Sequence, residues 1–211
     1  MRKPQEILEI FEILAKDNPE PQSELNYTNA FTLLVAIALS AQSTDKGVNK
    51  ATEALFKVAD TPQKMLDLGL DNLKQYIKTI GLYNNKAKNI IAMSEMLVKD
   101  FGGVVPNDQK ALESLAGVGH KTANVLRNVW FHEPTMAVDT HVFRIAHRLD
   151  FSQGKTVEKV EKDLLAVLPD KYLMYANHWL VLFGRYICKA QKPQCKDCPL
   201  SSYCYAEDKN I

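Results

Sequence analysis

The chain has 211 residues, of which 46% are hydrophobic, and its net charge is +1 at pH 7. This much apolar material suffices for one or two folded domains and excludes wholesale disorder. The N-terminus lacks the apolar stretch of a signal peptide, and the longest apolar run, Leu33 to Leu39, is too short to span a bilayer. We therefore expect a soluble cytoplasmic protein with no membrane partner.

Helical periodicity begins near the N-terminus. Pro4 suits a first helical turn, and apolar residues share one face from there to Leu14. The segment 31–39 is apolar on all sides, which predicts a central buried helix. Thr61 and Asp71 are expected to be the N-caps of two short helices.

The same periodicity continues to the C-terminal region. A longer helix is expected to end at Gly102 and Gly103, and further helices are expected over 122–130, 140–149, 157–168 and 172–183. Alternation of period two is absent, although residues 135–138 could be briefly extended. The sequence therefore predicts an all-α fold.

Two glycines separate the helical patterns on either side of residue 118. Gly117 and Gly119 lie within the segment Leu115–Ala123, and glycine permits positive φ angles and close approach of another group. The helix that follows would begin with backbone N–H groups that favour a phosphate. The segment is consistent with a helix–hairpin–helix, which holds DNA by its backbone, or with an ordinary tight turn between helices.

All four cysteines lie in one short stretch near the C-terminus, and the first 187 residues contain none. This clustering favours metal ligation over a disulfide scaffold. Thiolates bind iron in [4Fe–4S] clusters and also bind zinc, although zinc ribbons usually contain two closely spaced cysteine pairs and this stretch contains one. The candidate ligands are Cys188, Cys195, Cys198 and Cys204.

The hairpin segment is followed by a second motif that carries a resemblance to a known family. Eighteen residues after Lys121 stands the segment Val138-Asp139-Thr140-His141. Together the two motifs resemble the helix–hairpin–helix and Gly/Pro-loop-Asp pattern of the endonuclease III superfamily of DNA glycosylases. The segments 39–45 and 81–84 resemble the family too, and the cysteine spacing is that of its C-terminal [4Fe–4S] cluster.

Two positions depart from the family pattern. Ala116 stands where the family often has proline, and His120 stands where it often has arginine. The first change is expected to loosen the hairpin. The second removes a permanent charge, so phosphate binding is expected to be weaker or more dependent on pH.

The resemblance implies that Lys121 and Asp139 are catalytic. A lysine amine can attack C1′ of a damaged nucleotide, expel the base and form a Schiff base, from which β-elimination cuts the strand. Asp139 would take a proton and stabilise positive charge on the sugar. From the residues alone, a lysine early in a helix is usually a surface residue, and Asp139 before Thr140 also fits an N-cap.

Further DNA contacts follow from the resemblance. A base in duplex DNA must be flipped out before it can be attacked. Gln42 would fill the resulting gap and Leu82 would wedge the opposite strand, although a helix-end polar residue and a loop hydrophobe are the plainer interpretations. The other implied DNA-binding residues are Gly117, Gly119, His120, Arg185 and Lys192. Asp45 and His141 would lie near the pocket, and His141 also suits a buried structural histidine.

The family architecture comprises two α-helical domains flanking a DNA-binding cleft. We expect a six-helix domain over 23–133 and a discontinuous cluster domain over 1–22 plus 134–211. The implied activity is a monomeric glycosylase and abasic-site lyase acting on duplex DNA with damaged pyrimidines or abasic sites. The alternatives are a glycosylase without lyase activity, which would lack a lysine nucleophile, and a non-catalytic DNA-binding or redox module.

Overall fold

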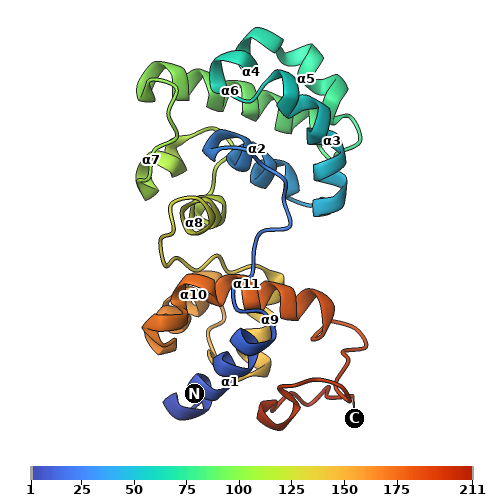
Figure 1. Ribbon diagram of the computed structural model, residues 1–211, viewed down its shortest axis with the longest axis vertical. Helices are drawn as coiled ribbons and strands as arrows, with labels where there is room; N and C mark the ends of the chain where they lie inside the picture. The colour runs from blue at the N-terminus through green and yellow to red at the C-terminus, as the bar shows by residue number, and fades with distance from the viewer. Residues whose placement is uncertain (1, 211) are drawn as a thin grey trace. The chain divides into compact units, whose positions relative to one another are not determined.

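The computed structural model describes residues 2–210, and these form eleven α-helices and one short 3₁₀ helix with no β-strand (Figure 1). The predicted all-α fold is confirmed. The segment 135–138 lies outside any helix and pairs with no strand in the described structure. Within the same residues, no helix combines the length and apolarity needed to cross a membrane.

The helices group into two compact units. One comprises Ser23–Phe131, and the other combines the segment up to Gln22 with the segment from His132 onward. The boundary expected after residue 133 therefore lies two residues earlier in the structure. Each unit has its own hydrophobic core.

The first unit is built around a buried helix. Helix α2 is apolar on all sides, as its sequence predicts, and packs against α3, α6 and α8. The described unit has seven helices where six were expected, and Asp108 caps the short helix before the hairpin. The helices are α2 (Ala30–Ser40), α3 (Asp45–Val58), α4 (Pro62–Leu68), α5 (Leu70–Ile77), α6 (Tyr83–Phe101), α7 (Gln109–Ser114) and α8 (His120–Val129).

The ends of these helices test the predicted caps. Thr61 caps α4, since its hydroxyl accepts a hydrogen bond from the Lys64 amide at 3.2 Å. The prediction for Asp71 is wrong: Gly69 occupies the N-cap of α5, and Asp71 lies in the first turn, where its charge still complements the helix dipole. Gly102 ends α6 in the left-handed conformation, as expected.

The second unit joins the two ends of the chain. Figure 1 shows the blue α1 among the orange and red C-terminal helices. Phe11 of α1 stacks on Phe151 and Tyr172 at ring-centroid distances of 5.9 Å, and the Trp179 indole donates to the carbonyl of Asn18 at 2.7 Å. The elements are α1 (Pro4–Asp17), α9 (Thr140–Arg148), α10 (Val157–Val167), α11 (Asp170–Tyr186) and η1 (Ser201–Tyr203).

Candidate active site and metal centre

The glycine hairpin between α7 and α8 is held by its own backbone and by α6. The Val118 amide donates to the Leu115 carbonyl at 3.1 Å, and the buried Val118 side chain anchors the turn in the core. Gly117 has a φ of +77°, and a Cβ built there would lie 2.9 Å from the side chain of Asn89. Only glycine fits this position without displacing α6.

The second hairpin glycine has a different role. Gly119 adopts an extended backbone with a φ of −101°, so this position does not use the positive φ that glycine permits. A Cβ built on Gly119 would meet nothing within 4 Å. The space beside the start of α8 is therefore open, which leaves room for another backbone to approach closely.

Lys121 is the second residue of α8. Its side chain is exposed, while Ala123 and Leu126 on the opposite face of the helix are buried in the core. The N-cap is Gly119, which has no side chain to satisfy the first turn. Lys121 thus lies at the positive end of a helix dipole, where negative phosphates are favoured.

His120 joins the two helices of the hairpin motif. Its Nδ1 lies 2.7 Å from the Glu113 carboxylate of α7. The Gln109 amide donates to the same carboxylate at 2.6 Å. Hydrogen bonding by Gln109 and His120 lowers the pKa of Glu113. Any positive charge on His120 is therefore offset by the adjacent Glu113 carboxylate. The arginine that the family often has at this position would instead carry a permanent charge near a phosphate.

Gln42 and Leu82 both have left-handed backbones. Their φ angles are +57° and +58°, and both side chains are exposed. Gln42 follows the end of α2, and Leu82 is the N-cap of α6. Non-glycine residues rarely adopt this conformation, and such strain persists where surrounding contacts enforce it. Asp45 begins α3 directly after the N-cap Thr44.

Asp139 caps α9 in the second unit. Its Oδ1 accepts hydrogen bonds from the backbone amides of His141 at 2.8 Å and Val142 at 2.9 Å. One carboxylate oxygen of Asp139 therefore acts as the N-cap of α9. These two donors also hold the carboxylate in a single orientation, which a catalytic acid–base group requires. The two roles are compatible.

His141 is half-buried in the first turn of α9. Its Nδ1 lies 3.3 Å from an Arg144 guanidinium nitrogen. A Cβ built on Gly184 of α11 would lie 2.8 Å from the Cβ of His141. The close contact of α9 with α11 therefore depends on glycine at position 184, and His141 has a structural role in that contact.

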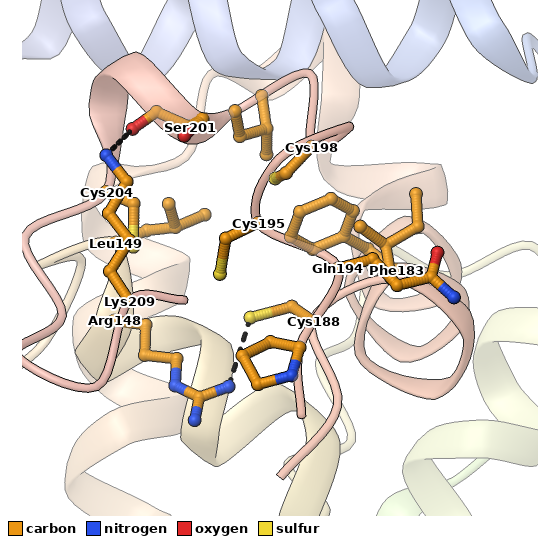
Figure 2. A pocket seen from close by; sticks show the side chains of 13 residues that line it. Arg148, Leu149, Phe183, Cys188, Gln194, Cys195, Cys198, Ser201, Cys204 and Lys209 are labelled. Atoms are coloured by element: carbon orange, nitrogen blue, oxygen red, sulfur yellow. Dashed lines mark hydrogen bonds between the residues drawn. The ribbon is translucent and has the colours of Figure 1, made fainter. Parts of the chain in front are cut away.

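The four cysteines surround one pocket at the end of α11 (Figure 2). The pocket is also lined by Phe183 and Leu200. No three His, Cys, Asp or Glu side chains among residues 2–210 are placed to bind a single metal ion. A [4Fe–4S] cluster has a different requirement, since each thiolate binds its own iron. Four thiols around a mainly apolar pocket fit that donor set.

Two arginines of α9 support the cysteine loop, and the sequence interpretation missed both. Arg148 donates to the Cys188 sulfur at 3.3 Å and to the Lys189 carbonyl at 2.7 Å. Arg144 donates to the Cys188 carbonyl at 3.0 Å. Their spacing of four residues on one helix face was the available signal.

The ionisation of the cysteines depends on their burial. Burial raises the pKa of the Cys188 thiol, and the adjacent Arg148 guanidinium opposes this shift. Burial also raises the pKa of Cys198. Ligation of iron or zinc requires thiolates, so metal binding would release protons from these groups.

Two basic residues to which DNA contacts were assigned lie in or near the cysteine loop. Arg185 lies half-buried in the last turn of α11. Lys192 is exposed and has a left-handed φ of +50°. The Gln194 amide donates to the Ile187 carbonyl at 3.0 Å, which closes the loop that carries Lys192.

Comparison with known proteins agrees with these features. Residues 35–170 match the family model described as HhH-GPD superfamily base excision DNA repair protein. The chain is 58% identical over 195 residues to endonuclease III of Rickettsia conorii, covering 92% of this chain and 93% of that protein. It is 52% identical over 202 residues to endonuclease III of Escherichia coli strain K12, covering 96% of each.

Solved structures of DNA complexes have the same fold. The structure of a trapped endonuclease III–DNA covalent intermediate matches with a TM-score of 0.91 and 44% identity, covering 97% of each chain. A non-covalent endonuclease III–DNA complex also matches with a TM-score of 0.91 and 44% identity, covering 97% of this chain and 96% of the other. The resemblance expected from the hairpin, the Asp139 segment and the cysteine spacing is confirmed. The chain belongs to the endonuclease III family of DNA glycosylases and abasic-site lyases, within the HhH-GPD superfamily of base excision DNA repair proteins.

Proposed function

We propose that this member of the family removes oxidised or ring-damaged pyrimidines from duplex DNA and then cuts the strand, acting as a monomer through Lys121 and Asp139. The observation that carries the proposal is the position of the exposed residue Lys121 at the start of α8, directly after the glycine hairpin. It is supported by the similar structure in which endonuclease III is trapped covalently on DNA.

In this proposal Lys121 is the nucleophile. Its neutral amine attacks C1′ of the damaged nucleotide, the glycosidic bond breaks, and the base leaves with the bonding electrons. The sugar ring opens to a Schiff base with the lysine. Loss of a proton from C2′ then expels the 3′ phosphate by β-elimination, and water releases the lysine. The phosphates held near the positive end of α8 keep the sugar in place.

Asp139 supplies the acid–base function. Its carboxylate accepts a proton from the attacking amine and stabilises the positive charge that develops on the sugar. The two amide donors at one oxygen fix the carboxylate in orientation. The proposed reaction therefore requires the Lys121 amine and the Asp139 carboxylate to act on the same sugar.

The remaining candidates bind and distort the DNA. Gln42 fills the space left by the flipped nucleotide, and Leu82 wedges the opposite strand. Their exposed, left-handed positions support this assignment. Further proposed DNA contacts are Gly117, Gly119, His120, Arg185 and Lys192, and Asp45 is proposed to lie near the base pocket, with His141 behind it.

Cys188, Cys195, Cys198 and Cys204 are the proposed ligands of a [4Fe–4S] cluster. When bound, the cluster supplies folding energy to a loop that has little core of its own. Arg148 and Arg144 hold the loop to α9. The ordered loop then presents Lys192 to a phosphate at a lower entropic cost than a mobile loop would.

Borohydride trapping tests the proposed reaction. The wild-type protein, incubated with a duplex that carries one 5,6-dihydrothymine, is expected to give a covalent protein–DNA adduct after borohydride is added, because borohydride reduces a Schiff base to a stable amine. An undamaged duplex of the same sequence is the control. Absence of the adduct while the damaged base is still released would indicate a glycosylase without lyase activity.

The metal assignment predicts the composition of the purified protein. Protein prepared without oxygen is expected to contain about four irons per chain with inorganic sulfide, as four thiolate ligands imply. Cys198→Ser is expected to lower both the iron content and the melting temperature, because ligation and folding are coupled. Ser202→Ala, at an exposed position in the same loop, is the matched control. Stoichiometric zinc without iron or sulfide would overturn the cluster assignment.

The contact of Lys192 with DNA predicts a change in salt dependence. On a logarithmic scale, affinity is expected to fall with salt at a slope of roughly −0.9 per phosphate neutralised. Lys192→Ala is expected to reduce the magnitude of the slope by about one unit and to weaken binding equally on all sequences. Lys16→Ala, at an exposed site on α1, is expected to leave the slope unchanged. An unchanged slope for Lys192→Ala would remove this loop from the DNA interface.

A further inference from the structure

Lys86, in the first turn of α6, makes three hydrogen bonds to the end of another helix. Its ammonium group donates to the carbonyl of Leu39 at 2.9 Å, to the carbonyl of Ala41 at 2.6 Å and to the hydroxyl of Ser43 at 3.3 Å. A lysine ammonium has three N–H donors. All three donors therefore have a partner in the last turn of α2 or in the segment that follows it.

The acceptors lie where a positive charge is most favourable. Helix α2 ends at Ser40, so its last carbonyls lack intrahelical partners and carry the negative end of the helix dipole. Partial burial removes water from Lys86 and lowers its pKa. An ammonium group that has lost water depends on protein acceptors, which makes this contact specific in geometry.

The same lysine touches the surroundings of both proposed insertion residues. Ala41 and Ser43, which its side chain binds, are the residues on either side of Gln42. Lys86 stands one helical turn after Leu82, and its backbone amide makes the ordinary first hydrogen bond of α6 to the Leu82 carbonyl at 3.1 Å. One residue thus connects two exposed loops whose tips both have left-handed backbones.

Helix α6 extends this arrangement to the hairpin. Leu82, Lys86 and Asn89 recur at intervals of four and three residues, so they share one face of the helix. Asn89 is the side chain against which Gly117 packs. The face of α6 that begins at Leu82 therefore supports all three loops to which DNA contacts are assigned in this unit.

We propose that Lys86 is a positioning residue for nucleotide flipping, which holds Gln42 and Leu82 as one preformed insertion unit. This inference rests on the proposed function, since it takes Gln42 and Leu82 to enter the DNA. A strained loop conformation persists only while its surroundings enforce it. Loops that are ordered before binding lose less conformational entropy when they enter the duplex. Lys86 lowers the cost of flipping without touching the reacting atoms.

The test separates flipping from chemistry. Lys86→Met keeps the length of the side chain and removes its three donors. Base release is expected to fall on the order of tenfold or more on a fully paired duplex with one 5,6-dihydrothymine, as the loss of a charge-assisted hydrogen bond implies. Release of the same lesion from a single-nucleotide bulge is expected to change little, because an unpaired nucleotide costs less to extrude. Lys86→Arg retains the charge and donors and is expected to restore part of the activity.

The matched control is Lys88→Met, an exposed lysine two residues away on the same helix. It is expected to behave as wild type on both substrates. Ser43→Ala removes one acceptor and leaves Lys86 charged, so it is expected to give a smaller loss in the same direction. Equal losses on paired and bulged substrates in Lys86→Met, accompanied by a lower melting temperature, would reduce Lys86 to a structural residue and overturn the proposal.

A direct measure of flipping completes the test. In protein made inactive by Lys121→Gln, a 2-aminopurine placed opposite the lesion is expected to brighten on binding, and Lys86→Met is expected to reduce that signal. The effects of Lys86→Met and Gln42→Ala are expected to be non-additive, since one residue acts through the other. Additive effects would contradict the proposal. Borohydride trapping of the wild type tests the proposed function separately, so a failure of either remains distinguishable.

Discussion

Replacement of Lys121 by glutamine is expected to abolish both borohydride trapping and strand cleavage on damaged DNA. Glutamine keeps the polarity and approximate size of the side chain but has no nucleophilic amine, so no Schiff base can form. Because Lys121 is exposed in α8, the variant is expected to keep the fold. The measurement is gel separation of adducts and cleaved strands after incubation with a 5,6-dihydrothymine duplex.

The binding step distinguishes a lost nucleophile from a lost interface. Lys121→Gln is expected to bind a duplex with a stable abasic-site analogue, because the phosphate contacts do not require the amine. Lys99→Gln, at an exposed lysine in the last turn of α6, is the matched control and should trap and cleave as wild type. Full trapping by Lys121→Gln would show that another amine attacks the sugar.

Asp139→Asn is expected to slow base removal by about 10²–10⁴-fold, the usual range for a positioned acid–base group. The asparagine oxygen can still accept the amide hydrogen bonds of His141 and Val142, so α9 keeps its cap. Cleavage at a preformed abasic site is expected to suffer less, since the base has already left and Lys121 remains. Single-turnover assays on the two substrates measure both rates.

Two further variants separate the cap from the carboxylate. Asp139→Ala removes both functions and is expected to lose a further ~1 kcal/mol of folding stability, the typical contribution of an N-cap. Asp108 caps α7 through the Ala111 amide and lies in the other unit, so Asp108→Asn is a matched control with a capping role alone. Normal base removal by a folded Asp139→Asn protein would leave Asp139 with only its capping role.

Local sequence determined the helices because their causes are local. A run of apolar residues without a polar face predicts a buried helix, and α2 is buried along most of its length. Thr61 caps α4 by a bond to an amide three residues ahead, which its own sequence context predicts. Asp71 shows the limit of the same argument, because the N-cap of α5 is Gly69, two residues earlier than the pattern indicated.

The sequence also predicted candidate functional residues where those residues stand at a characteristic spacing. The hairpin glycines, Lys121 and the four cysteines stand in short segments, so a resemblance could be recognised without knowledge of distant contacts. The resemblance to the endonuclease III family extends along nearly the whole chain and is confirmed by relatives that cover more than nine-tenths of it.

The tertiary structure alone decided which side chains support these segments. Lys86 reaches carbonyls more than forty residues earlier in the chain, and Arg148 reaches a cysteine forty residues later. Position 117 must be glycine because a Cβ there would clash with the side chain of Asn89, whereas a Cβ at Gly119 would face open space. Such contacts have no periodicity and no fixed spacing, since they arise only when separate helices pack. Sequence therefore determined the helices and the chemically distinctive residues, and packing decided what holds those residues in position.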